Sequence, residues 1–259
     1  MTTYSGITVE SLDGHVELTL NRPEKRNSLT LVVIEELIDA LEMVRQSDAF
    51  GVILASAGPV FCAGHDFDDM VARDLPQMRE LMQRCSRLMQ LIHEIPQTVV
   101  AAVQGLAVGA GCQLALTCDL AVAAEEAAFL TAGGTGGWFC FTPMVAVTRA
   151  VGRKRALEML MTGERIEAAR AAEWGIVNRV VPTDDLLVES RALRGRLKGG
   201  NQQMLWLGKQ AYYAQLDLDE GRAYAYAAEV MASTAMMPSP QARMRKFVAR
   251  RAARVNGMG

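Results

Sequence analysis

Two glycine-containing segments hold the residues best suited to chemistry. The first covers residues 59–66 and reads Pro-Val-Phe-Cys-Ala-Gly-His-Asp; the second covers residues 103–113 and reads Val-Gln-Gly-Leu-Ala-Val-Gly-Ala-Gly-Cys-Gln. Each pattern predicts an apolar strand, a glycine turn and the start of a helix, which leaves backbone N–H groups without an intramolecular acceptor. Two such turns facing each other would form an oxyanion hole, in which loss of one donor typically slows the reaction about 100- to 1,000-fold.

Alternating strands and helices must position these turns. A hairpin is expected at Asp13-Gly14, and apolar residues recur at helical spacing over residues 31–44 and 78–92, where the helix should end before Pro96. A further helix is expected over residues 110–117. Short apolar runs predict buried strands at residues 52–55, 98–103, 120–124 and 176–181. This alternation indicates an α/β fold.

The last quarter of the chain has a different pattern. From Asp184 onward it predicts helices only, interrupted at Pro238-Ser-Pro240 before a final basic helix. We therefore expect an α/β core over residues 1–199 that contains the site, and a helical region over residues 200–259 that serves oligomerisation.

Composition restricts the class of protein. The chain has 259 residues, 50% of them hydrophobic and 22% charged, which is ordinary for a globular domain with a sizeable core. The formal net charge of -2 gives no electrostatic attraction to nucleic acid or to an anionic membrane surface. Neither a secretory signal nor a membrane-spanning segment is expected.

The cysteines and histidines predict neither disulfides nor a metal site. The cysteines number five and include no CxxC pair, so we expect reduced thiols and a cytoplasmic location. The three histidines are widely separated and form no HExxH motif, which argues against zinc. A Rossmann nucleotide site is excluded because Leu114 stands where the third glycine is required, and neither a P-loop nor a GxSxG motif is present.

Several further segments complete a family pattern around the two glycine turns. Their order and spacing make the chain resemble the crotonase family, the enoyl-CoA hydratase/isomerase group, over essentially its whole length. The segments are residues 21–28 (Asn-Arg-Pro-Glu-Lys-Arg-Asn-Ser), 118–119, 148–152, 160–164, 173–178 and the basic stretch around Phe247.

The resemblance implies a fold, a substrate class and an assembly. The fold would be a spiral of ββα units with a helical C-terminal region that forms trimers, often paired into hexamers. The substrate would be an acyl-CoA thioester of lipid metabolism, with coenzyme A as part of the substrate and no separate cofactor. By position, the backbone N–H groups of His65 and Ala110 would polarise the thioester carbonyl and stabilise an enolate.

The chain departs from the family where its hydratases carry two catalytic glutamates. The resemblance places the first at Gln113 and the second at Gly133. A glutamine side chain does not exchange a proton at neutral pH, and glycine has no side chain. Acid–base catalysis normally contributes about 100- to 10,000-fold and needs a titratable group within reach. Hydration by the usual mechanism is therefore in doubt, because neither position carries a side chain that can transfer a proton.

Other side chains are candidates for the missing chemistry. The imidazole of His65 can titrate near neutral pH, and some decarboxylases of the family, such as methylmalonyl-CoA decarboxylase, carry histidine there and lack both glutamates. Alternatively, His65 contributes only its N–H. By resemblance, Cys140 occupies about the position at which that decarboxylase carries a tyrosine, so a chemical role is one interpretation. The alternative is that Cys140 is an inert buried thiol. Asp68 and Asp69 are interpreted as solvated helix-start acids, and Gln113 could bind a substrate carbonyl or water.

Coenzyme A needs cationic and apolar contacts. Arg26 is better suited than Lys25 to a phosphate because of its forked guanidinium, although a solvated loop pair is the alternative. Asp66 would also organise its loop through local hydrogen bonds. By resemblance, the expected CoA-binding residues are Lys25, Arg26, Ala63, His65, Asp66 and Phe67, with Phe247 and Arg250 contributed by a neighbouring subunit.

Three functions remain open at this point. The first is a hydratase or isomerase of 2-enoyl-CoA. The second is a decarboxylase of a malonyl-type thioester, in which loss of carbon dioxide forms the enolate without a base. The third is a catalytically silent acyl-CoA- or RNA-binding relative; the acidic charge balance argues against RNA.

Overall fold

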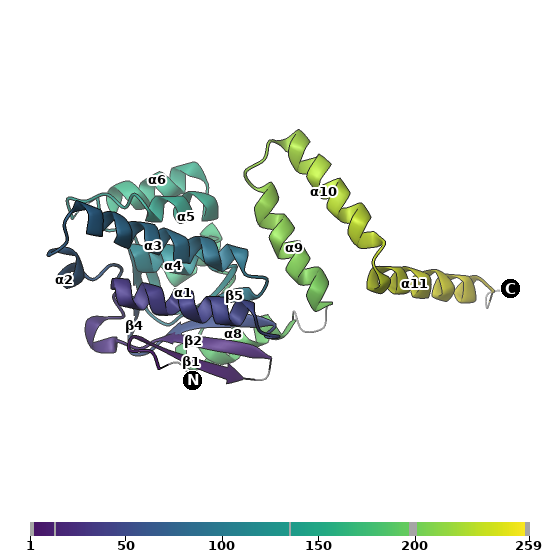
Figure 1. The fold of residues 1–259 in the computed structure, drawn as a ribbon, viewed down its shortest axis with the longest axis horizontal. Helices are drawn as coiled ribbons and strands as arrows, with labels where there is room; N and C mark the ends of the chain where they lie inside the picture. Colours follow the sequence, from purple (N-terminus) through teal and green to yellow (C-terminus); the bar gives the residue numbers. More distant parts are fainter. Residues whose placement is uncertain (1–2, 13, 135, 197–200, 257–259) are drawn as a thin grey trace. The chain divides into compact units, whose positions relative to one another are not determined.

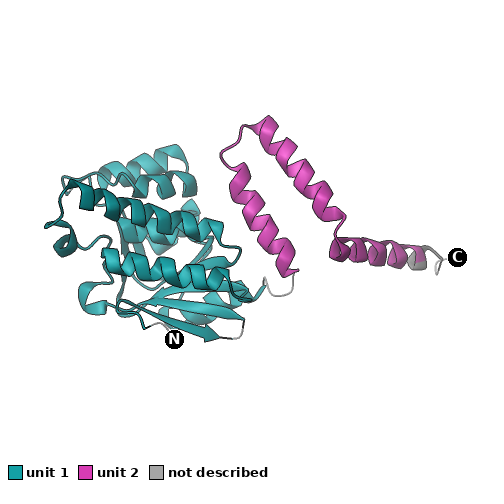
Figure 2. Cartoon of the chain, in the orientation of Figure 1, with its two compact units in different colours: residues 1–197 teal, residues 198–259 magenta. Residues whose placement is uncertain are grey.

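The chain consists of two units with different architectures: Met1–Leu197 and Lys198–Gly259 (Figure 2). The computed structural model describes residues 3–12, 14–134, 136–196 and 201–256, the last four of these by their backbone only. Asp13 of the expected hairpin turn lies outside the described residues. The first unit is a mixed α/β structure, as predicted, and the second is helical (Figure 1).

The larger sheet of the first unit has six strands in the order β1-β2-β3-β5-β7-β10. A hairpin of β1 and β2 starts it, and every later pair is parallel. The inner strands are runs of Val, Ile, Leu and Ala because parallel strands are covered on both faces. Their bounds are β1 Ile7–Leu12, β2 His15–Leu20, β3 Gly51–Ser56, β5 Thr98–Val103, β7 Leu120–Ala124 and β10 Arg179–Val181.

One predicted strand is shorter in the structure. The apolar run over residues 176–181 pairs with β7 only from Arg179 onward. Its first residues follow the left-handed Gly175 that ends a helix, and the Asn178 side chain accepts the Ala121 N–H at 2.8 Å. An asparagine side chain therefore takes the place of a ladder hydrogen bond, and the strand begins at Arg179, three residues later than predicted.

A smaller sheet positions the glycine turns. It has the order β4-β6-β8-β9, with β4, β6 and β8 parallel and β9 antiparallel. Its strands are β4 Val60–Cys62, β6 Leu106–Val108, β8 Ala128–Leu130 and β9 Ile166–Glu167. Each of β3, β5 and β7 is followed by one of these short strands, so the chain steps from one sheet to the other in a spiral. The carboxyl ends of β4, β6 and β8 consequently leave the small sheet at one edge.

Helices cover both faces of the larger sheet. On one face, α1 (Leu31–Arg45) and α3 (Leu75–Glu94) run side by side (Figure 1). Thr30 caps α1, and Asp74 with Gln77 forms a capping box on α3. The other face packs against α8 (Leu186–Gly195). The remaining helices of this unit are α2 (Phe67–Met70), α4 (Ala110–Thr117), α5 (Pro143–Ala150), α6 (Arg153–Thr162) and α7 (Ala168–Trp174).

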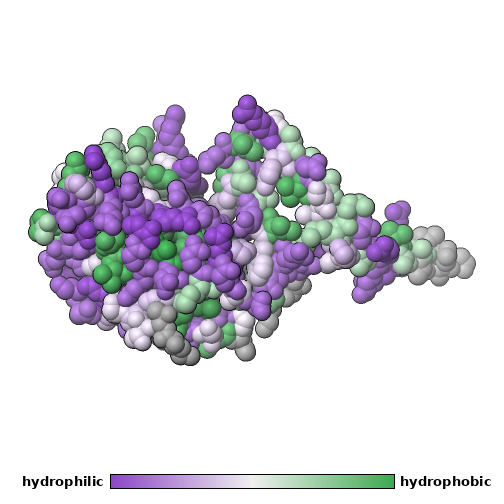
Figure 3. Space-filling view, in the orientation of Figure 1, coloured by the Kyte–Doolittle hydropathy of each residue, from purple (hydrophilic) through white to green (hydrophobic). Residues whose placement is uncertain are grey.

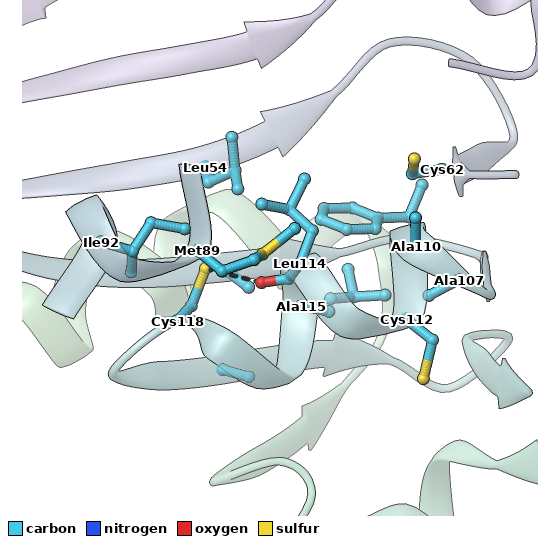
Figure 4. Close-up of a cluster of buried hydrophobic side chains, with 14 of the residues drawn as sticks. Leu54, Cys62, Met89, Ile92, Ala107, Ala110, Cys112, Leu114, Ala115 and Cys118 are labelled. Carbon is cyan, nitrogen blue, oxygen red and sulfur yellow. Dashed lines mark hydrogen bonds between the residues drawn. The ribbon is translucent and has the colours of Figure 1, made fainter. Parts of the chain in front are cut away.

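The core lies between the larger sheet, α1, α3 and α4. Leu54 of β3, Met89 and Ile92 of α3, and Leu114 of α4 belong to this buried cluster (Figure 4). Burial of such side chains contributes roughly 1.5–3 kcal/mol each. The core therefore fixes α4, whose first residue belongs to the second glycine turn. Among the described residues, no helix is long and apolar enough to cross a membrane.

The second unit consists of α9 (Gln202–Gln215), α10 (Glu220–Ala235) and α11 (Pro238–Asn256). The side chains of Asn201 and Asp219 cap α9 and α10. These two helices bury no residue, and apolar and polar side chains share their surface (Figure 3).

Candidate active site

The first glycine turn follows β4 and is held by Leu29. The Leu29 N–H donates to the Gly64 carbonyl at 2.8 Å, and the Asp66 N–H donates to the Leu29 carbonyl at 3.1 Å. Successive residues of an extended segment point in opposite directions. The N–H of His65, between these two bonds, therefore faces away from Leu29, and no described residue accepts it.

The second turn follows β6 and starts α4. Gly109 has φ 54° and ψ -115°, a conformation that favours glycine, and its N–H donates to the Leu130 carbonyl at 3.0 Å. Ala110 is the first residue of α4, where a backbone N–H has no carbonyl one turn earlier. Within the described chain nothing accepts the Ala110 N–H, whereas the Gln113 N–H already bonds to Gly109 at 2.9 Å.

The two turns pack directly against each other. A Cβ placed on Gly64, which has φ +91°, would lie 2.8 Å from the Val108 carbonyl oxygen and 3.3 Å from the Ala110 nitrogen. A Cβ placed on Gly111 would lie 2.2 Å from the Cys62 carbonyl oxygen. Only glycine permits this approach. The structure thus brings together the His65 and Ala110 turns, which are separated in sequence but leave adjacent parallel strands.

His65 is half-buried as a residue, but both of its ring nitrogens are buried. Neither ring nitrogen has a hydrogen-bond partner among the described residues. Burial lowers the pKa of the imidazole, and the Leu29 carbonyl and the Asp69 carboxylate oppose this shift without reversing it. The lowered pKa favours the neutral imidazole at pH 7. The Asp69 carboxylate is itself engaged, because it accepts the Leu31 N–H at 3.0 Å and pairs with Arg73 at 2.9 Å.

Gln113 lies one helical turn after Ala110 on the same side of α4. The residue is only 4% exposed. The buried Oε1 has no hydrogen-bond partner in the described part of the structure. Because a buried acceptor is normally satisfied, this oxygen indicates a place for a donor from outside the chain.

Gly133 follows β8, at the same edge as the other two turns. A Cβ there would lie 2.1 Å from the Trp138 carbonyl oxygen and 2.8 Å from the Cys140 Sγ. The chain itself therefore occupies the space of a side chain at this position. Cys140 is half-buried, and burial raises the pKa of its thiol despite a hydrogen bond from the Gly133 backbone. It remains protonated at neutral pH.

The predicted CoA-binding loop is fixed to the first turn. The Ala63 N–H donates to the Arg26 carbonyl at 3.0 Å, and Lys25 pairs with Asp68 at 3.1 Å. Burial alone would raise the pKa of Asp66, but hydrogen bonds from the Ser28 hydroxyl (2.8 Å) and nearby backbone N–H groups lower it. The side chains of Lys25, Arg26 and Phe67 are exposed.

Two predicted residues belong to the other unit. Phe247 and Arg250 lie on α11 and are exposed. The structure therefore establishes the helix on which the two residues lie and their exposure, and their predicted contact with CoA stays a prediction. Among the described residues, no group of three or more His, Cys, Asp or Glu side chains could hold a metal ion.

Sequence reasoning missed three supporting features. Asn27 adopts φ +53° and donates from Nδ2 to the carbonyls of Ala57 and Val60, each at 2.8 Å, which holds the loop before the first turn. Leu29 brackets His65 through its backbone, and Trp138 fills the third turn through its carbonyl. Residues that act through their backbone atoms cannot be identified from residue type alone. Only Asn27 could have been identified, because asparagine is one of the few residue types tolerated in the left-handed region.

Comparisons with known proteins point to one family. The enoyl-CoA hydratase/isomerase family model matches residues 11–257. The mitochondrial enoyl-CoA hydratase domain-containing protein 3 of Rattus norvegicus is 38% identical over 241 residues, covering 92% of this chain and 80% of that protein. A probable enoyl-CoA hydratase of Rhodobacter capsulatus is 34% identical over 223 residues, covering 82% of this chain and 83% of the relative.

Solved structures agree in fold. An enoyl-CoA hydratase of Mycobacterium smegmatis superposes with a TM-score of 0.91 at 38% identity, covering 95% of this chain and 97% of the other. Human enoyl-CoA hydratase domain-containing protein 3 gives a TM-score of 0.90 at 36% identity, covering 95% and 98%. The predicted α/β spiral is therefore confirmed.

These relatives contradict the expected cytoplasmic location. The proteins from rat, mouse and human are named as mitochondrial, so that prediction is wrong. Free cysteines argue against an oxidising compartment, but they do not distinguish one reducing compartment from another.

Proposed function

Because the chain belongs to the enoyl-CoA hydratase/isomerase family, we propose that it binds acyl-CoA thioesters and polarises the thioester carbonyl with the backbone N–H groups of His65 and Ala110. The observation that carries this proposal is the pair of packed turns, each with one N–H that no described residue accepts. Donors fixed before the reaction stabilise charge as it develops.

The enolate is the intermediate that this arrangement favours. Two N–H groups donate to the thioester oxygen, and the positive end of the α4 dipole, at Ala110, adds to their effect. Negative charge on the oxygen would be stabilised whether the enolate arises by loss of a proton, by addition to a double bond or by loss of carbon dioxide. The proposed chemistry thus depends on the backbone, and side chains decide which reaction follows.

The side chains favour decarboxylation of a malonyl-type thioester as a second candidate. Gln113 does not titrate, burial lowers the pKa of His65 and so favours its neutral form, and the chain fills the space of a side chain at Gly133. Hydration or isomerisation of a 2-enoyl-CoA requires proton transfer by groups that are not at these two positions. Decarboxylation forms the enolate directly and needs no base.

A side-by-side assay tests both candidates. The wild-type protein is given crotonyl-CoA, with hydration followed by loss of enoyl absorbance, and methylmalonyl-CoA, with decarboxylation followed by product mass. We expect turnover of at least one thioester. Binding of CoA thioesters without turnover of either would reduce the protein to a silent binder, and absence of binding would overturn the proposal.

We propose that CoA is recognised by the loop that carries Lys25 and Arg26, together with the first turn from Ala63 to Phe67. The two cations are exposed and lie beside that turn, where the Arg26 carbonyl accepts the Ala63 N–H. Phe247 and Arg250 would reach the CoA of a neighbouring subunit. No further cofactor is proposed.

Self-association with copies of this chain is part of the same proposal. Helices α9 and α10 bury no residue, and large apolar side chains of α10 are exposed to water. Tyr224 is 71% exposed and Met231 is 73% exposed. Covering apolar faces of this kind with a second copy would remove them from water. We expect a trimer or a hexamer, which light scattering coupled to size-exclusion chromatography would distinguish from a monomer.

A further inference from the structure

The turn after β8 forms a third wall of the proposed site. Because β8 is parallel to β6, its carboxyl end leaves the sheet beside the second glycine turn. The Gly109 N–H donates to the Leu130 carbonyl at 3.0 Å, which ties the two turns together. The chain beyond Leu130 therefore starts next to the Ala110 donor.

Within this wall, the Cys140 thiol stands where a side chain of residue 133 would be. The Gly133 backbone approaches so closely that an added Cβ would lie 2.8 Å from the Cys140 Sγ. The Trp138 N–H donates to the Gly133 carbonyl at 2.8 Å, and the Met144 N–H donates to the Cys140 carbonyl at 3.0 Å. These bonds hold the thiol between the turn and α5.

Cys140 also packs against the buried core, to which Ala110, Cys112 and Leu114 of α4 belong. Cys112, a member of that core, lies on α4 two residues after Ala110. The next residue, Gln113, has a buried Oε1 without a partner among the described residues. An unsatisfied buried acceptor indicates that a ligand group or water belongs beside this part of α4.

We propose that Cys140 is a specificity-determining residue whose Sγ borders the acyl group of the bound thioester. This inference rests on the proposed function, because the thioester carbonyl must lie at the His65 and Ala110 donors. The thiol is small and uncharged, so it presents a compact apolar surface to the acyl chain. The volume of residue 140 then sets which acyl groups fit.

Protection from alkylation tests the position of Cys140. The other four cysteines are buried and Cys140 is half-buried, so iodoacetamide at pH 8.5 should modify Cys140 first, as mapped by peptide mass spectrometry. Saturating butyryl-CoA should slow this modification about 10-fold or more, and CoA alone should slow it less. The Cys140→Ser variant identifies the modified site, because it should lose the fast-reacting position.

The outcomes separate the two proposals. Equal modification with and without butyryl-CoA, at a concentration shown by calorimetry to saturate the protein, would overturn the role of Cys140 and leave the proposed function standing. If no acyl-CoA binds, the proposed function fails and this inference fails with it.

Acyl preference tests the role in specificity. A single methylene in an apolar pocket changes discrimination roughly 10- to 200-fold. In Cys140→Phe we expect the Kd for hexanoyl-CoA to rise about 10-fold or more relative to the Kd for CoA, whereas Cys140→Ala should bind hexanoyl-CoA at least as well as wild type does. A parallel change for CoA and hexanoyl-CoA would overturn the inference. Should Cys140→Phe fail to fold, Cys140→Val supplies the larger side chain.

Discussion

The turns after β4 and β6 and the turn after β8 leave the same edge of the small sheet, but their glycines have different consequences. Gly64 lets two turns approach until a Cβ would lie 3.3 Å from the Ala110 nitrogen, while the N–H groups of His65 and Ala110 keep no internal acceptor. Gly133 also permits a close approach, but there the Trp138 carbonyl and the Cys140 thiol enter the vacated space.

The difference separates two parts of catalysis. Charge stabilisation needs only backbone donors, and the first two turns retain them. Proton transfer needs a titratable side chain, and the third turn has no room for one at Gly133. The proposed site therefore combines two backbone N–H groups that no described residue accepts with the absence of a carboxylate at Gln113 and Gly133.

Replacing Ala110 with proline should have the largest effect. Proline removes the N–H and is compatible with the first position of a helix, so the fold should survive. We expect turnover of an accepted acyl-CoA to fall about 100- to 1,000-fold, with the Kd for CoA nearly unchanged. The matched control, Ala110→Ser, keeps the N–H. Unchanged turnover in Ala110→Pro would contradict the role of this donor.

The substitution Gly133→Glu tests whether the turn after β8 has room for an acidic side chain. A Cβ would meet the Trp138 carbonyl oxygen at 2.1 Å, so the turn must shift, and overpacking of this kind costs about 1–3 kcal/mol. We expect a lower free energy of unfolding and no gain in crotonyl-CoA hydration. Gly152→Ala is the control, because a Cβ there meets nothing within 4 Å. Full stability with new hydratase activity would show that the third turn has room for an acid.

The substitution Gln113→Glu asks whether an acid can be restored where space exists. Glutamate has nearly the same volume as the glutamine and would stand one turn after Ala110. One acid of the expected pair should raise crotonyl-CoA hydration about 10-fold, below the roughly 100- to 10,000-fold range for acid–base catalysis. Gln113→Leu, which fills the space without titrating, should give no increase. Equal rates for both variants would exclude this position from proton transfer.

The contrast between the turns also explains what the sequence could predict. Apolar periodicity located the helix over residues 31–44, and the glycine motifs located the two turns whose N–H groups at His65 and Ala110 no described residue accepts, because turn geometry demands particular residue types. Gly133 was found as a missing side chain, but nothing in its neighbourhood indicated that the Trp138 carbonyl would fill the gap. The strand over residues 176–181 began later than predicted because the Asn178 side chain replaces a backbone partner. Such features depend on tertiary contacts, which local pattern does not encode.

The ring of His65 gives the smallest predicted effect, and it separates the side chain from the backbone donor of the same residue. Burial lowers the folded-state pKa of this imidazole below the ordinary value of about 6.5. At a pH between the folded-state and unfolded-state pKa values of His65, the unfolded chain binds more protons than the folded chain. The contribution of the neutral His65 ring to the free energy of unfolding is therefore fully present above about pH 6.5 and is lost as the pH falls. For one proton, the free energy of unfolding then changes by at most about 1.4 kcal/mol per pH unit.

Urea unfolding of wild type and His65→Asn at pH 7.5, 6.5 and 5.5 measures this slope. The variant keeps the backbone N–H and removes the titration, so wild type should lose more stability than the variant between pH 6.5 and 5.5. The carboxylates of Asp66 and Glu17 also have lowered pKa values, below their ordinary values of 3.8 and 4.5, so they titrate outside this interval and are common to both proteins. Identical slopes would mean that the ring is solvated, and the first turn would then hold its oxyanion donor beside water rather than in the dry surroundings that strengthen it.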